Sequence, residues 1–366
     1  MSQVQVRDHW TTRVVETGSA WRAAEDELVS AGVRIPLSHT LAWAEFGLKN
    51  SCRLLTVRDG EDRLAASVAV RMDRSRVLPG HCSLRVDELD ALPSATLEPT
   101  IAALTRLVRS NPKFLRLTVR LFSRGDRHEA ASLLERYGYR LSTRPDMYRY
   151  TLTLNLLDGQ QAIFASLHRS ARRNIRHMQQ HSTLVQRTLT DTIYADRIRA
   201  LHDESMGRHG GRHRNLDWQS ILRLSHLHPD LSRISGLFLS ESDLRPEALV
   251  AFCWGTMQGD HGTYTAAGTT RLPNTRAAFS YPLLWDLILW ARQRGAEWFD
   301  LGGVTVGNHP DDQLQGISRF KGFFSRTVED VSEEWAIEPN PYRAFLARWP
   351  SRGVNFLSSL VGRRKT

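Results

Sequence analysis

Four arginines between residues 169 and 176 have a spacing that suits the binding of an anion. They fall at i, i+3, i+4 and i+7, which places them on one face of a helix: Arg169, Arg172, Arg173 and Arg176. No Asp or Glu occurs from residue 159 to residue 190. Because guanidinium groups match phosphate oxygens, the stripe predicts a phosphate site. A solvated helix face would give the same spacing, and the stripe alone does not distinguish tRNA from a nucleotide sugar or lipid headgroups.

A second candidate site lies between residues 297 and 326. A short apolar strand there ends near Asp300 and is followed by Gly302 and Gly303. Paired glycines after a buried strand let another backbone or a ligand approach closely, because no Cβ is in the way. Further along, Lys321 is flanked by aromatic residues, and it is one of four lysines among the 49 Lys and Arg residues. We interpret it as an ammonium retained for function; the alternative is a surface lysine whose stem covers apolar neighbours.

The size and composition of the chain are those of a globular protein. With 366 residues, 41% hydrophobic and 24% charged, it has room for two domains. Its three cysteines are scattered, which predicts neither a disulfide framework nor a zinc site. The first residues lack a secretory pattern, and no apolar run approaches ~18 residues, so no integral membrane segment is expected. These features favour a reducing, cytoplasmic location.

The overall charge favours an anionic partner. The formal net charge is +10 and the pI is about 10.0. Nucleic acid, phosphate-bearing substrates and a membrane surface all fit such a balance. An arginine-rich composition can also reflect a GC-rich genome, so the charge points to a partner only where the arginines cluster.

The first part of the chain predicts alternating helices and strands. Helices are expected at 18–30, 39–49, 97–108 and 129–137, the last ended by Gly138. Strands are expected at 53–58, 64–72, 114–122 and 147–156, and an Asp-Gly turn at residues 59–60 joins the first two into a hairpin.

The second part repeats this order. The earlier pattern recurs as a strand pair at 236–240 and 248–257, a strand at 261–269, a helix at 277–294 and a strand at 298–301. This recurrence indicates a duplicated α/β unit with a mixed sheet. We therefore expect two α/β domains, 1–156 and 157–350. A strand near Trp335 and a helix at 342–349 close the second domain, and residues 351–366 form a basic tail.

Several common sites are missing from the sequence. It contains no GxxxxGK[ST], GxGxxG, HExxH or GxSxG motif. His209 and His213 are spaced i, i+4 but straddle two glycines, which favours a loop over a metal site. We therefore expect no metal site and no bound cofactor.

Three stretches resemble the Fem-type aminoacyltransferases, which are built from tandem GNAT-like acyltransferase domains. Residues 166–176 (SLHRSARRNIR) are similar to the basic helix of the family, 299–303 (FDLGG) to its strand end, and 316–324 (GISRFKGFF) to its F-K signature. Together they span about half of the chain. The resemblance implies transfer of an amino acid from aminoacyl-tRNA, as co-substrate, to an amine of a peptidoglycan precursor, a peptide or a small molecule. The oligomeric state is left open.

The resemblance also implies roles for particular residues. Lys321 would steady charge in the reacting ester. Independently of the resemblance, the place of Asp300 at a strand end beside the glycine pair suits a group that orients the amine or acts as base, with a capping or loop-bracing carboxylate as the alternative. The expected substrate-binding residues are Arg172, Arg173, Arg176, Arg208, Tyr264, Gly302, Gly303, Arg319, Phe320 and Phe324. Of these, Arg208 would hold phosphates of the acceptor and Tyr264 would line its channel.

The chain departs from the family in two ways. It has no heptad run for the helical hairpin of many peptidoglycan-type members, and the loop at 304–315 is longer than in many relatives. Both departures leave the acceptor open. The main alternative is an acyl-CoA N-acyltransferase, but residues 269–276 lack the glycine-rich loop that holds pyrophosphate in such enzymes. A degenerate fold that only binds ligands is the third alternative.

Overall fold

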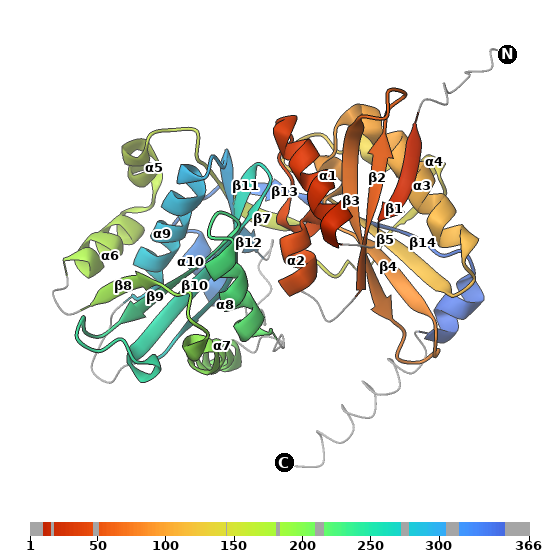
Figure 1. Ribbon diagram of the computed structural model, residues 1–366. Helices are drawn as coiled ribbons and strands as arrows, with labels where there is room; N and C mark the ends of the chain where they lie inside the picture. The colour runs from red at the N-terminus through yellow and green to blue at the C-terminus, as the bar shows by residue number, and fades with distance from the viewer. Residues whose placement is uncertain are drawn as a thin grey trace. The chain divides into compact units, whose positions relative to one another are not determined.

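The computed structural model describes residues 10–15, 18–46, 51–143, 145–180, 184–208, 216–271, 278–304 and 315–347. The chain forms two compact units (Figure 1). Unit 1 comprises Met1–Val33, Leu48–Asp146 and Ser332–Thr366, and unit 2 comprises Arg34–Gly47 and Met147–Val331. These bounds differ from the contiguous domains expected at 1–156 and 157–350, because each unit takes in a segment from elsewhere in the chain. The expected basic tail lies outside the described residues.

Unit 1 is built on a seven-stranded mixed sheet. Its strands lie in the order β1 (Thr11–Val15), β2 (Ser51–Arg58), β3 (Leu64–Arg74), β4 (Cys82–Val86), β5 (Phe114–Phe122), β14 (Ser332–Ile337) and β6 (Arg140–Leu141). All neighbours are antiparallel except β4 and β5, which are parallel. A parallel pair needs a crossover, and α3 (Ser94–Ser110) supplies it.

Helices pack on this sheet through apolar faces. α3 and α4 (His128–Arg136) enclose a core with the inward residues of β4 and β5. α4 is followed by Gly138 at φ 89°, the left-handed conformation that ends helices and favours glycine. α1 (Gly18–Ser30) buries Trp21, Ala24 and Leu28 and lies against β3.

Unit 2 repeats the same sheet. Its order is β8 (Val185–Thr188), β9 (Ser232–Phe238), β10 (Leu249–Gln258), β11 (His261–Thr269), β12 (Trp298–Gly303), β7 (Tyr150–Asn155) and β13 (Val328–Asp330). Again one pair, β11 and β12, is parallel and the rest are antiparallel. The predicted duplication is confirmed, with one addition: β14 completes the first sheet and β7 the second, in equivalent positions.

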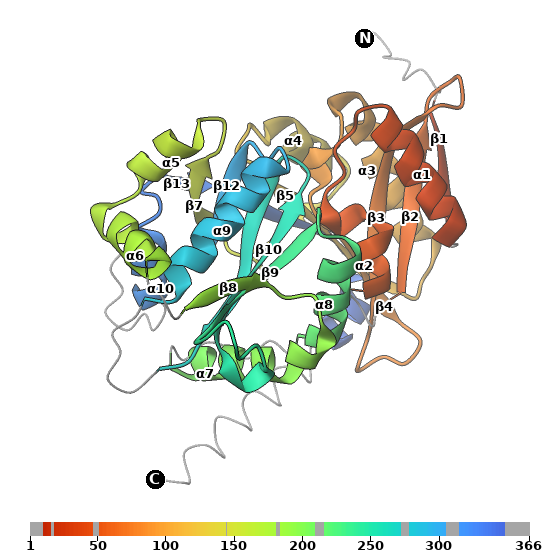
Figure 2. The same ribbon diagram turned by 60° about the vertical axis from the view of Figure 1, so that its left-hand side comes forward.

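Two helical layers cover the second sheet, as Figures 1 and 2 show. α9 (Ser280–Gln293) lies on one face, and α6 (Arg169–Gln179) packs against α9. α5 (Gln160–Ser166) reaches the same layer through Phe164, whose ring centroid is 5.2 Å from that of Trp285. α7 (Ala195–Arg208) and α8 (Trp218–Leu227) cover the other face. Alternation along β10 supplies both cores, with Cys253 on the α9 side and Phe252 and Trp254 on the α7 side.

Shorter elements complete unit 2. α10 (Gln315–Lys321) follows β12, and α2 (Leu41–Phe46) packs on α8. The helix predicted at 39–49 is thus a 3₁₀ turn (Leu37–His39) followed by a shorter α-helix, with residues 47–50 outside the described ones. The loops expected at 209–213, 269–276 and 304–315 lie wholly or largely outside them as well. None of the described helices has the length and apolar character to cross a bilayer.

Candidate functional site

The parallel strands of unit 2 part near their carboxyl ends. β11 and β12 pair only from His261 to Thr263, after which β11 continues along β10 while β12 ends at Gly303. A pocket of about 510 Å³ lies where they part, and we call it the strand-end pocket. Its wall comes from the second half of β11, the end of β12, α7 and α10, together with Tyr148 and Ser280. Ligands commonly bind at such strand ends in α/β sheets.

Asp300 is completely buried and acts as a brace in the floor of this region. Its oxygens accept hydrogen bonds from the Thr151 hydroxyl (2.5 Å), the Gly302 N–H (2.7 Å) and the Tyr148 hydroxyl (2.5 Å). A buried carboxylate is tolerated when donors satisfy it, as here. It is not among the residues that line the strand-end pocket. The geometry therefore favours the loop-bracing alternative over direct contact with a substrate.

The two glycines admit side chains of the protein itself. Gly302 has φ 78°, and a Cβ there would lie 3.1 Å from the Lys321 Nζ. A Cβ on Gly303 would lie 2.5 Å from both the Cβ and the Cγ of Tyr148, closer than non-bonded carbons approach. The space beside the glycines is therefore taken by the side chains of Tyr148 and Lys321, and the expected approach of a ligand stays a prediction. Both glycines also line the strand-end pocket.

Gly303→Ala is expected to lower the free energy of unfolding by about 1–3 kcal/mol, because the added methyl overpacks the site against Tyr148. Urea denaturation followed by circular dichroism measures this. Gly207→Ala is the matched control, since this glycine lies in α7 with open space beside it. The control should be neutral or slightly more stable, because alanine favours helix. Equal stability of Gly303→Ala and the wild type would contradict the close packing.

Lys321 places a buried ammonium in the pocket wall. The residue is only 6% exposed, and its Nζ donates to the Gly303 carbonyl at 2.8 Å. It also lies 5.9 Å from the ring centroid of Tyr264. Burial lowers the pKa of Lys321 to about 8, while the negative charge of Asp300 acts in the opposite direction. This amine is therefore charged at neutral pH but close to its titration point.

Three other predicted residues line the same pocket. Tyr264 lies on β11, and burial raises the pKa of its hydroxyl well above the usual value. Phe320 packs edge-to-face on Tyr281 at 5.0 Å. Arg208 ends α7 and donates to the Thr269 carbonyl at 2.6 Å, which ties the helix end to the end of β11. The structure thus brings Arg208, Tyr264, Phe320, Lys321 and the glycine pair together.

Besides the arginines of residues 172–176, two predicted contacts, Arg319 and Phe324, are not among the residues that line the strand-end pocket. Phe324 is 0% exposed in the apolar core and stacks on Tyr281 at 5.6 Å. The ring serves packing, so its predicted contact with a substrate stays a prediction that this geometry does not support. Arg319 is exposed and is not among the residues that line the strand-end pocket. It stays a prediction without support from this geometry.

The arginine helix is confirmed as α6, and its charges share one face. Arg169, Arg172, Arg173 and Arg176 together line a shallow hollow of about 660 Å³, which we call the arginine face. The opposite side of α6 buries Ala171, Ile175 and Met178 in the core. The Arg172 guanidinium donates to the Ala165 carbonyl at 2.8 Å, and the Arg176 guanidinium lies 5.2 Å from the ring centroid of Phe164.

The residues that hold Asp300 carry no signal in the sequence. Tyr148 and Thr151 precede it by 152 and 149 positions, and only the pairing of β7 with β12 brings them together.

Sequence reasoning also missed the acid-free lining of the strand-end pocket. Among the described residues that line it, none is Asp or Glu, whereas Arg208 and Lys321 are cationic. Such a wall favours anionic or neutral groups.

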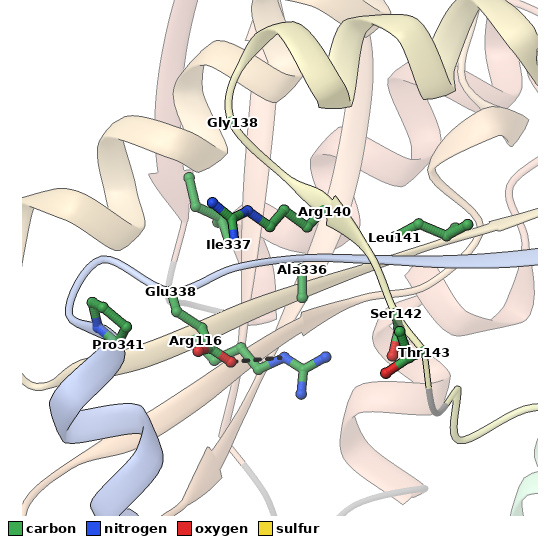
Figure 3. Close-up of a pocket in the computed structure, with 10 residues that line it drawn as sticks. All are labelled: Arg116, Gly138, Arg140, Leu141, Ser142, Thr143, Ala336, Ile337, Glu338 and Pro341. Atoms are coloured by element: carbon green, nitrogen blue, oxygen red, sulfur yellow. Dashed lines mark ion pairs between the residues drawn. The ribbon is translucent and has the colours of Figure 1, made fainter.

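Unit 1 has a hollow of its own, of about 590 Å³, beside β6 and β14 (Figure 3). Its Arg116 is already held by two carboxylates, Glu334 at 3.8 Å and Glu338 at 3.9 Å. The dashed line in Figure 3 marks the pair with Glu338. No lysine is found among the described residues that line it. This hollow therefore lacks a counterpart of the buried amine in unit 2.

Comparison with known proteins supports the fold. No family model matches this chain, and no curated protein matches its sequence. The crystal structure of FemX aligns with 91% of this chain and 100% of its own, at a TM-score of 0.71 and 12% identity. The structure of L-PGS from Bacillus licheniformis aligns with 89% of this chain and 96% of its own, at a TM-score of 0.51 and 11% identity. A tandem GNAT protein from the clavulanic acid biosynthesis pathway aligns with 90% of this chain and 99% of its own, at a TM-score of 0.46 and 13% identity.

At these identities the likeness concerns the fold. The FemX alignment extends over nearly the whole of both chains, so it includes both units and their shared strand order. The prediction of an α/β protein with two tandem domains on mixed sheets is confirmed, and the fold is similar to that of FemX.

Proposed function

We propose that this protein is an aminoacyltransferase that moves an amino acid from aminoacyl-tRNA to an amine and forms an amide bond. The observation that carries the proposal is the buried ammonium of Lys321 in the acid-free wall of the strand-end pocket. The arginine face of α6 gives independent support, because it offers four guanidiniums to a polyanion. The likeness to FemX agrees with the resemblance of three sequence motifs to Fem-type enzymes.

The chemistry requires little beyond positioning and charge stabilisation. The neutral amine attacks the ester carbonyl carbon, the new C–N bond forms, and the C–O bond to the ribose breaks. The ribose oxygen leaves with the proton that the amine gives up. An ester is already activated, so holding the reactants together and stabilising the oxyanion supply the acceleration. No metal or cofactor is needed for these steps.

We assign oxyanion stabilisation to Lys321. An ammonium has three N–H donors, and the bond to Gly303 uses one of them. Lys321 is 6% exposed, and one buried donor to an oxyanion contributes about 10²–10³ in rate. Asp300 acts through other groups: it fixes the Gly302 N–H and the Tyr148 hydroxyl, and so positions the strand end that holds Lys321.

The lining also suits the nucleophile. A protonated amine would find no carboxylate among the described residues that line the strand-end pocket, and the Lys321 ammonium repels it, whereas the charge of Arg208 is balanced by its ion pair with Glu204 at 2.5 Å. Nearby positive charge favours the neutral form of an amine, which is the form that attacks. As acceptor we propose the amine that the resemblance to Fem-type enzymes implies, on a peptidoglycan precursor, a peptide or a small molecule. Charged tRNA is made in the cytoplasm, where we place the reaction.

The pH profile of the transfer step should reflect Lys321. The pKa of its amine is lowered to about 8, so the ammonium is present below that pH and is lost above it. The single-turnover rate is expected to fall as the pH rises through about 8, since the stabilising charge disappears. Measurement with a pre-charged tRNA and a fixed concentration of neutral amine separates this effect from titration of the acceptor. A rate that instead rises through this range would assign Lys321 as a base.

Charge reversal on the arginine face should weaken tRNA binding. Arg169→Glu/Arg173→Glu is expected to reduce the slope of log K against log salt by about 2, one for each arginine that no longer neutralises a phosphate. Filter binding from ~50 to ~200 mM salt measures it. Arg223→Glu is the matched control, because Arg223 is an exposed arginine on α8, which covers the opposite face of the sheet. Equal slopes for the double variant and the wild type would remove the arginine face from the site.

Consumption of the acyl donor separates this proposal from an acyl-CoA N-acyltransferase. The full chain is incubated with a pool of candidate amines and either a mixture of charged tRNAs or a mixture of acyl-CoAs. Amine-dependent loss of the aminoacyl ester, with the acyl-CoAs intact, is the expected result. Amine-dependent release of free CoA would replace the proposal by the alternative. If neither donor is consumed, a ligand-binding role takes its place.

A further inference from the structure

The strand-end pocket has an apolar end on the side of the sheet that α7 covers. Trp254 of β10 and Ala266 of β11 are cross-strand partners, and both line the pocket. Leu216, just before α8, lines it as well and packs, as Ala266 does, against the core that contains Trp254. Met206 of α7 is half-buried in the same wall. We call Met206, Leu216, Trp254 and Ala266 the apolar end.

Direct contact between α7 and β11 fixes the shape of the apolar end. A Cβ on Gly268 would lie 2.6 Å from the carbonyl carbon of Leu201 and 2.7 Å from the backbone nitrogen of His202, so the helix backbone touches the strand. The His202 ring is buried against Trp218, with the ring centroids 5.6 Å apart. Met206 follows His202 by four residues, which places both side chains on the face of α7 that meets the pocket.

The polar groups at this end already bond within the protein. The Ser205 hydroxyl accepts from the Thr269 N–H at 2.9 Å, and the Arg208 guanidinium donates to the Thr269 carbonyl at 2.6 Å. The indole N–H of Trp254 donates to the Ser232 hydroxyl at 2.9 Å, so this side chain offers its ring carbons to the pocket. A ligand group that enters here therefore meets apolar surface and polar groups that have partners.

We propose that the apolar end holds the side chain of the transferred amino acid, and that this side chain is uncharged, apolar and larger than that of alanine, as in leucine or methionine. The inference rests on the aminoacyl transfer proposed above. An amino acid carries its side chain on the carbon next to the ester carbonyl. A carbonyl held at Lys321 therefore keeps the side chain within the same pocket of about 510 Å³.

The physical chemistry of the pocket favours this class of side chain. Each methylene group that moves from water onto the apolar end lowers the free energy of the bound ester. A lysyl or arginyl side chain would lose its hydration and would lie in one pocket with the Lys321 ammonium, which repels it. A carboxylate would also lose its hydration, and the charge of Arg208 is already balanced by Glu204 at 2.5 Å.

Single-turnover transfer to one fixed amine tests the proposal on the full chain. One tRNA is acylated in turn with leucine, methionine, alanine, lysine or glutamate, so that contacts with the tRNA body stay the same. The leucyl and methionyl esters are expected to react at least about 10-fold faster than the alanyl ester, because an apolar pocket gains about 10- to 200-fold for one methylene. They should react about 100-fold faster than the lysyl and glutamyl esters, whose charges would be buried.

Met206→Glu should change this preference in a defined direction. A carboxylate at the apolar end pairs with the lysyl ammonium, so transfer from the lysyl ester should rise about 10-fold and transfer from the leucyl ester should fall about 10-fold. Ala200→Glu is the matched control, because it adds the same charge to an exposed position of α7 outside the pocket. It should keep the wild-type preference. Circular dichroism should show both variants folded, since glutamate is a good helix former.

The outcomes separate this inference from the proposed function. Equal rates for the leucyl, alanyl and lysyl esters, or faster transfer of a charged residue, would overturn the inference and leave aminoacyl transfer in place. A Met206→Glu variant that keeps the wild-type order of esters but uses the amine less well would place the acceptor at the apolar end, which overturns the inference too. If the wild type consumes none of the esters with any amine, the aminoacyltransferase function fails and the inference fails with it.

Discussion

Lys321→Met should lose about 10²–10³ of turnover and yet unfold at a higher denaturant concentration than the wild type. The rate falls because the donor proposed to stabilise the oxyanion is gone. Stability rises because methionine fills a similar volume without a buried charge. Lowering the pKa from 10.5 to about 8 corresponds to about 3 kcal/mol of unfavourable burial. The variant also loses the hydrogen bond to the Gly303 carbonyl, which offsets part of the relieved burial penalty. The free energy of unfolding should therefore rise by about 1–2 kcal/mol.

The stability difference should depend on pH in a defined direction. Between pH 8 and 10.5 the unfolded chain holds a proton on this lysine that the folded chain has lost, so wild-type stability rises with pH there. Below about pH 8 both states are protonated and the full penalty applies. The gain from Lys321→Met is therefore largest at neutral pH and shrinks toward pH 10.5.

Urea denaturation at pH 7 and pH 9.5, together with single-turnover transfer, measures both effects. Lys113→Met is the control, because Lys113 is exposed and lies in unit 1. It should change neither rate nor stability. An unchanged rate in Lys321→Met would leave the binding-protein alternative, and an unchanged stability would show that the amine is hydrated in the folded state.

Asp300→Ala should be the most destabilising single change in this region, at about 3–5 kcal/mol. The side chain is 0% exposed and accepts from three donors. Removing it leaves the Tyr148 hydroxyl, the Thr151 hydroxyl and the Gly302 N–H without this acceptor, and a buried unsatisfied donor costs about 1–3 kcal/mol. The Thr151 hydroxyl keeps a second acceptor in the Gly302 carbonyl at 2.8 Å, which limits its share.

Denaturation in urea measures the loss, and Asp300→Asn gives a graded comparison. The amide oxygen can still accept, so the asparagine variant should lose less stability than the alanine variant. Asp196→Ala is the control, because its side chain is 88% exposed on α7 and its partner Arg199 is 3.3 Å away; the expected change is within ±0.5 kcal/mol. If Asp300→Asn folds normally and loses turnover as completely as Lys321→Met, Asp300 is a base and not a brace.

Local patterns predicted much of the secondary structure. The helix at Gly18–Ser30 and the strands at Phe114–Phe122 and His261–Thr269 have the expected bounds. Each is bounded by local signals, such as a glycine or a turn, and has its own apolar periodicity. The arginine face was predictable for the same reason, because i, i+3, i+4 spacing is a property of one helix.

Features that depend on distant pairing were not predictable. β14 joins β5, and β7 joins β12, although neither pairing leaves a local trace in the sequence. The bracing of Asp300 by Tyr148 follows from the second of these pairings. Phe324 shows a different limit: a motif identifies a conspicuous aromatic residue, but only three-dimensional packing decides whether it meets a ligand or the core.

The place of β14 has a consequence for biosynthesis. This strand lies in the interior of the first sheet, between β5 and β6, yet it consists of residues Ser332–Ile337. Translation adds about 5–20 residues per second, and the amino-terminal part of most proteins can fold while the rest is still being made. Here the first sheet must wait for its sixth strand until residue 337 has left the ribosome. The second unit, complete at Val331, can fold before the first.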